Sequence, residues 1–220
     1  MSIRILCLNI LLLAATCYPT AIPQIILPYL ARYAGKKSNV IYLCICNILY
    51  IVLCLISLLV LQGTLSIKEP NSVWWYVVAI GSGGGLILLE IIVGKFVMFL
   101  RGKETRGISI NNSWQNANAP IFVCTITLAI FEEINFRMMW NEVTIMQIGL
   151  PVYVFVIMSA AFYAVNHLYY GFETFLQKLV TGIILAFFYV FSGEAIIIPI
   201  LVHVFQNLII LIWGRSKEGE

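Results

Sequence analysis

The sequence predicts an all-α membrane protein, a polytopic bundle of about seven transmembrane helices. Of the 220 residues, 61% are hydrophobic and only 10% are charged, whereas soluble domains are about 45–50% apolar and about 25% charged. The mean hydropathy is +0.97. Apolar runs long enough to cross a bilayer, about 20 residues each, recur along the whole chain.

Seven apolar segments are predicted to span the membrane. They are residues 5–30, 40–62, 73–100, 119–140, 150–167, 175–191 and 195–213, the first of them bent or broken near Pro19 and Pro23. The last three are short for a straight crossing, so strongly tilted or re-entrant helices are compatible with them. Because no polar or low-complexity linker divides the chain, we expect a single membrane-embedded domain over residues 1–220.

Basic residues between these segments predict the orientation. With the N-terminus outside, the cytoplasmic segments carry Arg32, Lys36, Lys37, Arg101, Lys103, Arg106, Lys178, Arg215 and Lys217, and the outer segments carry only Arg4 and Lys68. The positive-inside rule therefore predicts an outer N-terminus and a cytoplasmic C-terminus. We expect an integral protein of a cell membrane, bacterial in origin, surrounded by lipid. The net charge of +3 is too small to suggest a nucleic-acid partner, and no oligomeric state is predicted.

Cysteines and a glycine run have structural interpretations. Six cysteines (Cys7, Cys17, Cys44, Cys46, Cys54 and Cys124) lie in apolar runs without CxxC spacing, so we expect small buried or lipid-facing side chains rather than disulfides or a zinc site. The run GSGGG at 81–85 predicts close helix packing or a kink. Glu90 and Lys95, near the cytoplasmic end of the same span, are expected to extend toward the membrane surface.

The stretch FEEINFR, residues 131–137, places three ionisable groups inside an apolar segment. Facing lipid, Glu132, Glu133 and Arg137 would cost about 2.5–3.5 kcal/mol each, on the order of 8–10 kcal/mol together. We therefore expect them to face the bundle interior or a hydrated cavity. Glu133 and Arg137 are spaced i, i+4 and can pair on one helix face. Glu132 is rotated by about 100° from Glu133, has no local cation and is left free to react.

Further polar groups lie in the later segments. Both histidines of the chain, His167 and His203, are there, and Asn207 shares a helix face with His203. A glutamate can act as general base on water, while imidazole and amide donors stabilise an oxyanion. Alternatively, Glu132, His167 and His203 bind a divalent metal such as zinc, and the second glutamate is the base. Each group alone is also compatible with helix–helix hydrogen bonding, but their joint occurrence favours a site.

Depth along ideal helices supports a common site only in part. At about 1.5 Å per residue, Glu132 and His203 lie at matching depths in a hydrocarbon core of about 30 Å. His167, counted from a span that starts at residue 150, lies too deep by about a dozen ångströms.

These residues resemble the signature of the CPBP family, the CAAX proteases and bacteriocin-processing enzymes, also called the Abi family. The signature EExxxR, FxxxH and HxxxN is matched in order by Glu132-Glu133-x3-Arg137, Tyr163-x3-His167 and His203-x3-Asn207. Tyr163 replaces the usual Phe, and Met138 stands where a Gly often follows the arginine. The resemblance covers about residues 119–210, which we interpret as a motif-bearing catalytic core. The first hundred residues fit only as membrane spans.

The resemblance implies an intramembrane endopeptidase, a hydrolase that cuts a membrane-associated peptide or protein tail of CAAX, leader or signalling type. By analogy with the Ras-converting CAAX protease, Glu132, assisted by His167, would activate water, and His203 with Asn207 would hold the oxyanion. The ion pair of the first motif would orient the site. Family members are often described as metalloproteases, and a metal-free glutamate mechanism is equally open.

Two other functions stay open. A bacteriocin-immunity membrane protein of the same fold would use the site weakly or without turnover. An ion-coupled transporter could relay protons through its Glu, His and Arg residues. Two observations argue against it, namely the absence of an internal repeat in the sequence and the HxxxN pairing, which a proton relay does not require.

Overall fold

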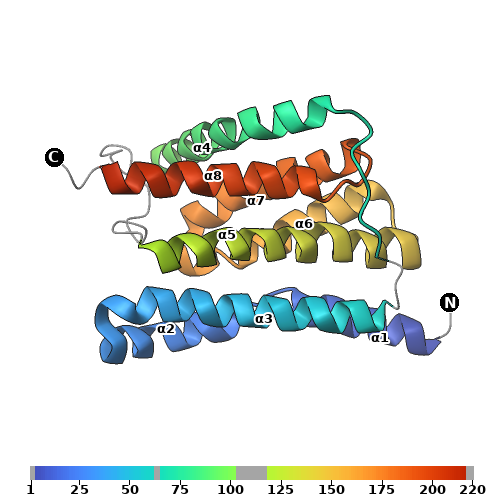
Figure 1. Ribbon diagram of the computed structural model, residues 1–220, viewed down its shortest axis with the longest axis horizontal. Coiled ribbons are helices and arrows are strands. Elements are labelled where there is room, and N and C mark those ends of the chain that lie inside the picture. The colour runs from blue at the N-terminus through green and yellow to red at the C-terminus, as the bar shows by residue number, and fades with distance from the viewer. Residues whose placement is uncertain (1–2, 62–64, 103–117, 217–220) are drawn as a thin grey trace.

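The computed structural model describes residues 3–61, 65–102 and 118–216 (Figure 1). The α-helices are α1 (Ile3–Thr16), α2 (Ala21–Ala34), α3 (Ser38–Val60), α4 (Trp74–Leu100), α5 (Ala119–Glu133), α6 (Val152–Val165), α7 (Phe172–Phe191) and α8 (Ile197–Ser216). Short 3-10 helices, η1 (Gly35–Lys37) and η5 (Leu168–Tyr170), and π-helical segments, η3 (Ile134–Met139) and η4 (Glu142–Gln147), complete the set. The predicted all-α class is confirmed.

Seven apolar helical segments account for the described chain. Five are long and apolar enough to cross a bilayer, namely Ile3–Ala34, Ser38–Val60, Trp74–Leu100, Ala119–Gln147 and Phe172–Phe191. Val152–Val165 and Ile197–Trp213 are shorter apolar helices. This is the polytopic membrane bundle that the sequence predicts. The first segment is broken between α1 and α2, where the sequence predicts a bend.

Polar side chains from other helices hold this break. Asn166 Oδ1 accepts hydrogen bonds from Thr20 N at 3.2 Å and Thr20 Oγ1 at 2.8 Å, and Asn166 Nδ2 donates to Cys17 O at 3.1 Å. Asn135 Nδ2 donates to Thr16 O at 3.3 Å. Because an unpaired backbone group is costly in lipid, these bonds allow the helix to break at membrane depth.

The predicted end of the fourth span at residue 140 is wrong. The helical segment continues through η3 and η4 to Gln147, and π-helical turns of this kind are frequent at functional sites. The number of residues from Glu132 to Gln147, where the segment ends, equals the number from Val152, where α6 begins, to His167. Both side chains therefore lie at a similar distance from the α5–α6 turn, and the excess depth calculated for His167 came from the misplaced helix end.

The helices form two unequal parts (Figure 1). One is a layer of α1, α2 and α3, which meets the rest of the molecule mainly where α3 packs on α5. The other contains α4 to α8, with α6 packed on α7, and α8 packed on both α4 and α5. The first described residues of α1 and the end of α8 lie at opposite ends of the bundle.

Close packing of α4 on α8 depends on one glycine of the GSGGG run. A Cβ atom on Gly83 would lie 2.8 Å from the Cβ of Phe205 on α8. Gly81 and Gly85, by contrast, would meet no atom within 4 Å. The prediction of close helix packing is thus confirmed at Gly83, where a side chain would separate the two helices.

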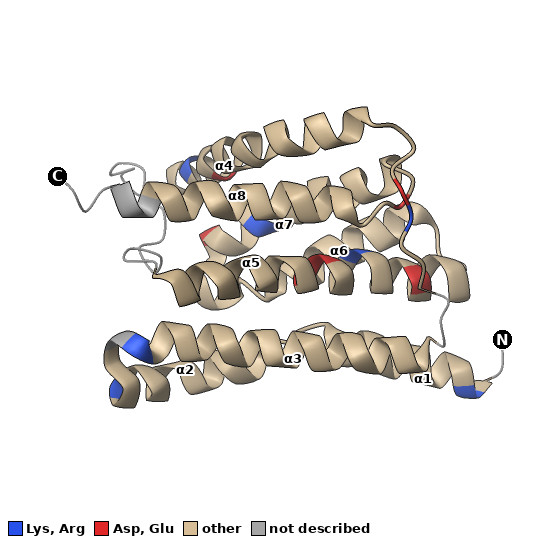
Figure 2. Ribbon diagram, in the orientation of Figure 1, with Lys and Arg blue, Asp and Glu red and all other residues tan. Residues whose placement is uncertain are grey.

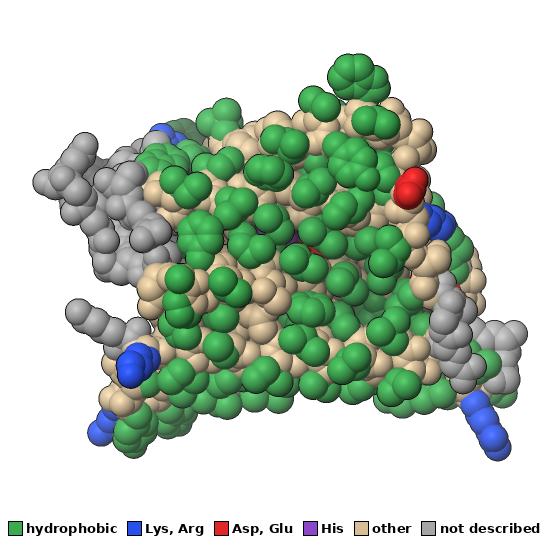
Figure 3. All heavy atoms as spheres, in the orientation of Figure 1, with side chains coloured by type: hydrophobic (Ala, Val, Ile, Leu, Met, Phe, Trp, Pro, Cys, Tyr) green, Lys and Arg blue, Asp and Glu red, His purple; other side chains and the backbone are tan. Residues whose placement is uncertain are grey.

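The surface and the charge distribution fit a membrane protein. Hydrophobic side chains cover the face between the two ends of the bundle (Figure 3). Charged side chains lie largely at the ends, with a few exceptions inside the bundle on α4, α5, η3 and α7 (Figure 2). The protein is therefore an integral membrane protein with ionisable groups at depth.

Candidate active site

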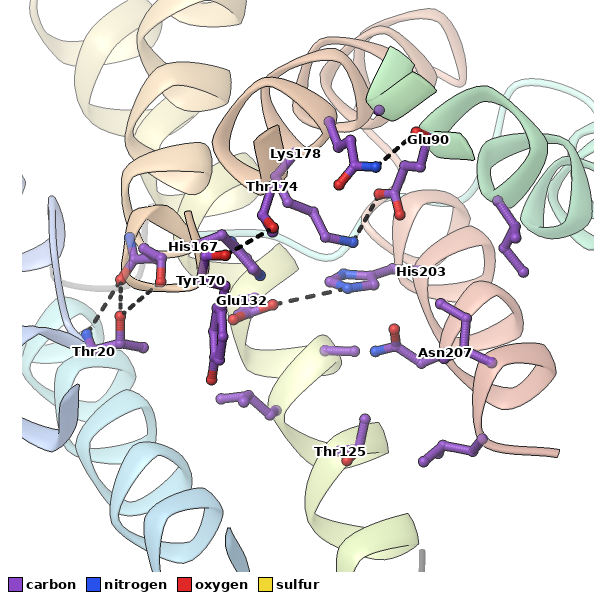
Figure 4. Close-up of a pocket in the computed structure, with 18 of the residues that line it drawn as sticks. Thr20, Glu90, Thr125, Glu132, His167, Tyr170, Thr174, Lys178, His203 and Asn207 are labelled. Carbon is purple, nitrogen blue, oxygen red and sulfur yellow. Dashed lines mark hydrogen bonds and ion pairs between the residues drawn. The ribbon is translucent and has the colours of Figure 1, made fainter. Parts of the chain in front are cut away.

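A cavity of about 470 Å³ lies among α4, α5, α7 and α8, and Thr20, Tyr42 and Leu43 of the α1–α3 layer border it on one side. Its inner part is lined by Glu132, His167, His203 and Asn207 (Figure 4). Its outer part is lined by residues near helix ends, among them Tyr42 of α3, Met98 of α4, Glu173 of α7 and Leu211 of α8. Those ends lie on one side of the bundle (Figure 1), so the cavity runs from the middle of the molecule toward this side, here called the mouth end.

Glu133 and Arg137, the other two predicted site residues, lie behind the cavity wall and are fully buried. Arg137 Nε is 3.2 Å from Glu133 Oε2, so the predicted i, i+4 ion pair forms. Arg137 Nη1 also donates to Ser159 Oγ at 2.8 Å, and Ser159 Oγ donates to Phe136 O at 2.6 Å. Two opposite charges compensate each other where water is excluded, and the serine fixes the guanidinium.

His203 lies between the two glutamates. Its Nδ1 is 2.8 Å from Glu133 Oε1, and its Nε2 is 3.9 Å from Glu132 Oε2. Because a carboxylate accepts hydrogen bonds, Nδ1 carries a proton and donates to Glu133, which fixes the ring orientation. The second distance is too long for a direct hydrogen bond but suits one bridging water. Glu133 therefore orients His203, and Glu132 and His203 Nε2 face each other across the cavity.

His167 follows the last turn of α6 and is half-buried. Its Nδ1 is 3.0 Å from the carbonyl oxygen of Tyr163. Since a carbonyl only accepts, Nδ1 is the donor, and Nε2 of the neutral ring carries the lone pair. His167 and Glu132 border the same space (Figure 4). An imidazole lone pair next to a carboxylate can help to take a proton from water.

The ring of Tyr163 packs between the ionisable groups. Its centroid is 5.0 Å from that of His167 and 5.9 Å from that of His203, and Arg137 Cζ lies 5.1 Å from it. The buried hydroxyl of Tyr163 has no hydrogen-bond partner among the described residues. A phenylalanine would make the same ring contacts, which explains how tyrosine can stand where the CPBP signature has phenylalanine.

Asn207 lies one helical turn after His203 on α8 and lines the same cavity. Its amide nitrogen is a hydrogen-bond donor and its oxygen an acceptor. With Glu132 and the two histidines, the cavity therefore offers a carboxylate base, an imidazole lone pair and amide and imidazole donors. These are the groups that hydrolysis of a peptide bond requires.

Besides Glu173 at the mouth, two further charged residues line the cavity, and sequence reasoning missed both. Lys178, expected among the cytoplasmic charges, and Glu90, expected to extend to the membrane surface, instead form an ion pair with a distance of 2.7 Å from Nζ to Oε1. Thr181 Oγ1 donates to the same oxygen at 2.7 Å. The energetic argument applied to Glu132, that a charge inside an apolar helix needs a polar environment, would have identified both residues.

A divalent metal bound by Glu132, His167 and His203 is one of the arrangements that the sequence leaves open. In the parts of the chain that the structure describes, no group of three or more His, Cys, Asp and Glu side chains is placed to hold a metal ion. The Nδ1 atoms of both histidines are engaged, one with Glu133 and one with the Tyr163 carbonyl, so Nε2 is the atom through which either ring would bind a metal. A site made of Glu132 and these two Nε2 atoms is therefore a proposal, which an activity assay with and without chelator tests.

The motif-bearing part of the chain matches a known family. The model of the family described as type II CAAX prenyl endopeptidase Rce1-like matches residues 114–209, a little under half of the chain. No curated protein and no solved structure matches the chain. Residues 114–209 are thus similar to the Rce1-like family of type II CAAX prenyl endopeptidases, and this match confirms the resemblance that the three motifs predict.

Proposed function

We propose that this protein hydrolyses a peptide bond in the tail of a membrane-associated peptide or protein with a water molecule activated by Glu132. The family supports an intramembrane endopeptidase. The observation that carries the finer proposal is the convergence of Glu132, His167, His203 and Asn207, from three separate helical segments, on one cavity at membrane depth. CAAX, leader and signalling peptides are all compatible substrates, and the family name favours a CAAX tail.

The proposed reaction has two steps. Glu132 takes a proton from water, helped by the Nε2 lone pair of His167, while the water oxygen bonds to the scissile carbonyl carbon. The carbonyl oxygen becomes an oxyanion that accepts hydrogen bonds from Asn207 Nδ2 and from His203 Nε2 in its protonated form. Glu132 then returns the proton to the amide nitrogen as the C–N bond breaks, releasing a carboxylic acid and an amine.

Glu133 and Arg137 orient the site in this proposal. Glu133 holds Nδ1 of His203, so Nε2 points toward Glu132. Arg137 balances the charge of Glu133, and Ser159 fixes Arg137 in turn. Neither member of the ion pair lines the cavity, so both act through His203 rather than on the substrate.

We further propose that the mouth end of the cavity faces the cytoplasm. At this end lie Arg32, Lys37 and Arg101, and at the other end lie Arg4 and Lys68. Lys178 lines the cavity and no longer counts among the nine basic residues predicted for the cytoplasmic segments. Eight then remain on the cytoplasmic side against two on the outer side, so the positive-inside rule still predicts the same orientation. Of those eight, Lys103, Arg106 and Lys217 lie outside the described residues. A reporter fused after α8 that is active only in the cytoplasm tests the orientation.

A cleavage assay on the purified protein tests the chemistry. The substrate is a farnesylated fluorogenic CAAX peptide, and the variant is Glu132→Gln, which keeps the size of the side chain and removes the base. We expect a loss of about 10²–10⁴ in rate. Glu142→Gln is the matched control, because Glu142 belongs to the same helical segment and does not line the cavity. Unchanged cleavage by Glu132→Gln refutes the mechanism.

The same assay addresses the metal and the alternative functions. Activity that persists after chelation supports the metal-free mechanism, and activity that is lost and then restored by zinc supports the metal-bound one. A protein that cleaves no peptide but protects cells against a bacteriocin with Glu132→Gln in place would be a non-catalytic immunity protein. Proton flux in vesicles that depends on Glu132 would identify a transporter.

A further inference from the structure

Among the residues that the structure describes, Lys178 is the only lysine or arginine that lines the cavity. Its ammonium group has three N–H donors, and among the described residues the bond to Glu90 is the one that it makes. The side chains of Lys178 and Glu90 are each 14% exposed, so the pair is largely removed from water. Figure 4 shows the ammonium pointing into the cavity beside His203. A cation with spare donors in a cavity at membrane depth can bind an anion.

The other acidic residues of the cavity leave this cation available. Glu90 Oε1 also accepts a hydrogen bond from Thr181 Oγ1, so it keeps a donor when the ammonium turns toward a second acceptor. Glu173, at the mouth, is paired with Arg101. Among the described residues, Glu132 is the remaining carboxylate of the cavity, and it serves as the base in the proposed function. Among the lysine and arginine side chains that the structure describes, Lys178 is therefore the one in the cavity that the carboxylate of an incoming ligand can reach.

The position of the ion pair relative to Glu132 suggests what this ligand is. Counted from the helix ends at the mouth, at about 1.5 Å per residue, Glu90 lies about 15 Å along α4 and Glu132 about 20 Å along α5. The ion pair therefore lies nearer the mouth than the base, in the same cavity. An extended peptide covers about 3.3–3.6 Å per residue, so the difference in depth of about 5 Å corresponds to one or two residues, and a three-residue tail connects the two points when it runs obliquely across the cavity.

We propose that Lys178, held by Glu90, binds the free C-terminal carboxylate of the substrate and thereby selects a bond a few residues from the chain end. The inference rests on the proposed function and adds a recognition element to it. A CAAX box stands at the C-terminus by definition, so cleavage after its cysteine releases a tripeptide that carries this carboxylate. Of the charged groups on such a peptide, the carboxylate is the one that a lysine attracts.

The experiment compares two forms of one farnesylated fluorogenic CAAX peptide, the free acid and the C-terminal amide. The measured quantity is the ratio of their kcat/KM values. A hydrogen bond between charged groups contributes about 1.5–3 kcal/mol, so we expect the wild-type protein to prefer the acid by about 10- to 100-fold. Lys178→Met should bring the ratio to about one, mainly through a higher KM for the acid. Lys95→Met, an exposed lysine of α4 outside the cavity, should leave the ratio unchanged.

Glu90→Gln supplies the opposite prediction. It keeps the ammonium and removes the competing carboxylate, so the preference for the acid should rise above that of the wild-type protein. A purely structural ion pair would not shift the ratio in opposite directions in the two variants. The double variant Glu90→Gln with Lys178→Met removes both charges together, avoids leaving either one buried alone, and should show a ratio of about one.

Several outcomes overturn the inference while leaving the proposed function intact. The first is equal rates for acid and amide in the wild-type protein, with cleavage still dependent on Glu132. The second is a preference for the acid that survives Lys178→Met. The third is an equal loss of kcat on both peptides in Lys178→Met, without a change in KM. If neither Lys178 variant folds, an unchanged ratio in Glu90→Gln overturns it and a raised ratio supports it. Failure of the proposed function itself is distinct, because cleavage would then be absent or independent of Glu132.

Discussion

Replacing Arg137 with methionine should destabilise the protein because it leaves a buried carboxylate without its cation. Arg137 and Glu133 are both fully buried, with 3.2 Å between Nε and Oε2. Removing one partner of a buried pair costs about 3–5 kcal/mol. The contact lacks hydrogen-bond geometry between these two atoms, which favours the lower part of that range. The lost bond to Ser159 adds about 1 kcal/mol, so we expect about 4 kcal/mol for Arg137→Met.

The double variant Glu133→Gln with Arg137→Met separates the charge effect from the packing effect. Removing both charges avoids the unpaired carboxylate, and replacement of a buried pair by neutral side chains is often neutral or stabilising. The amide oxygen of glutamine can still accept the hydrogen bond from His203 Nδ1. We therefore expect the double variant to be within about 1 kcal/mol of the wild-type protein, once the lost bond to Ser159 is included.

A double-mutant cycle measures the difference. The free energy of unfolding is determined in mixed micelles by circular dichroism for the wild-type protein, the two single variants and the double variant. A coupling energy of at least about 3 kcal/mol between Glu133 and Arg137 is expected, because Arg137→Met alone costs about 4 kcal/mol and the double variant only about 1 kcal/mol. A coupling below about 0.5 kcal/mol, or an Arg137→Met protein as stable as the double variant, would show that the buried carboxylate does not need this cation.

Three more predictions concern the oxyanion site, helix packing and the placement of the N-terminal layer. Asn207→Ala should lower kcat by about 10²–10³ with little change in KM; a change confined to KM would refute its role toward the oxyanion. Gly83→Ala should destabilise the protein by about 1–3 kcal/mol, because the added Cβ meets α8 at 2.8 Å, while Gly85→Ala, with no atom within 4 Å, should be neutral or slightly stabilising; equal stability of the two variants in thermal unfolding would contradict the packing. Copper-phenanthroline oxidation should join Cys44 and Cys124, whose Sγ atoms are 3.7 Å apart, and mass spectrometry of the cleaved chain should find no such link in Cys44→Ser.

The membrane fold and the motif residues could be predicted because both follow from the cost of transfer into lipid. Apolar length predicts which segments span the membrane, and the same energetics single out any charge that interrupts them. This reasoning identified Glu132, Glu133 and Arg137, and the local i, i+4 spacing correctly predicted which carboxylate pairs with the arginine. Contacts within one helix depend only on helical geometry, so a sequence is sufficient to predict them.

Contacts between helices could not be predicted in the same way. The bond from His203 on α8 to Glu133 on α5 depends on the rotation of each helix about its axis, which no local pattern specifies. The same applies to Lys178 on α7 and Glu90 on α4. The end of the fourth span was misplaced for a related reason. The predicted span stops at residue 140, directly before the polar Asn141, but Asn141 is buried at 3% exposure within the continuing helix.

Catalysis and substrate recognition draw on different parts of the chain. The groups proposed to carry out the reaction all lie within residues 114–209, the segment that matches the family. The cavity wall also includes Thr20, Tyr42 and Glu90, from helices outside that segment. Tyr42 Oη lies 3.4 Å from Tyr170 Oη and thereby connects α3 to the turn before α7. The family match does not include these parts of the wall. It therefore supports the chemistry of the site, and the shape and charge of the entrance must be argued from this chain's own N-terminal helices.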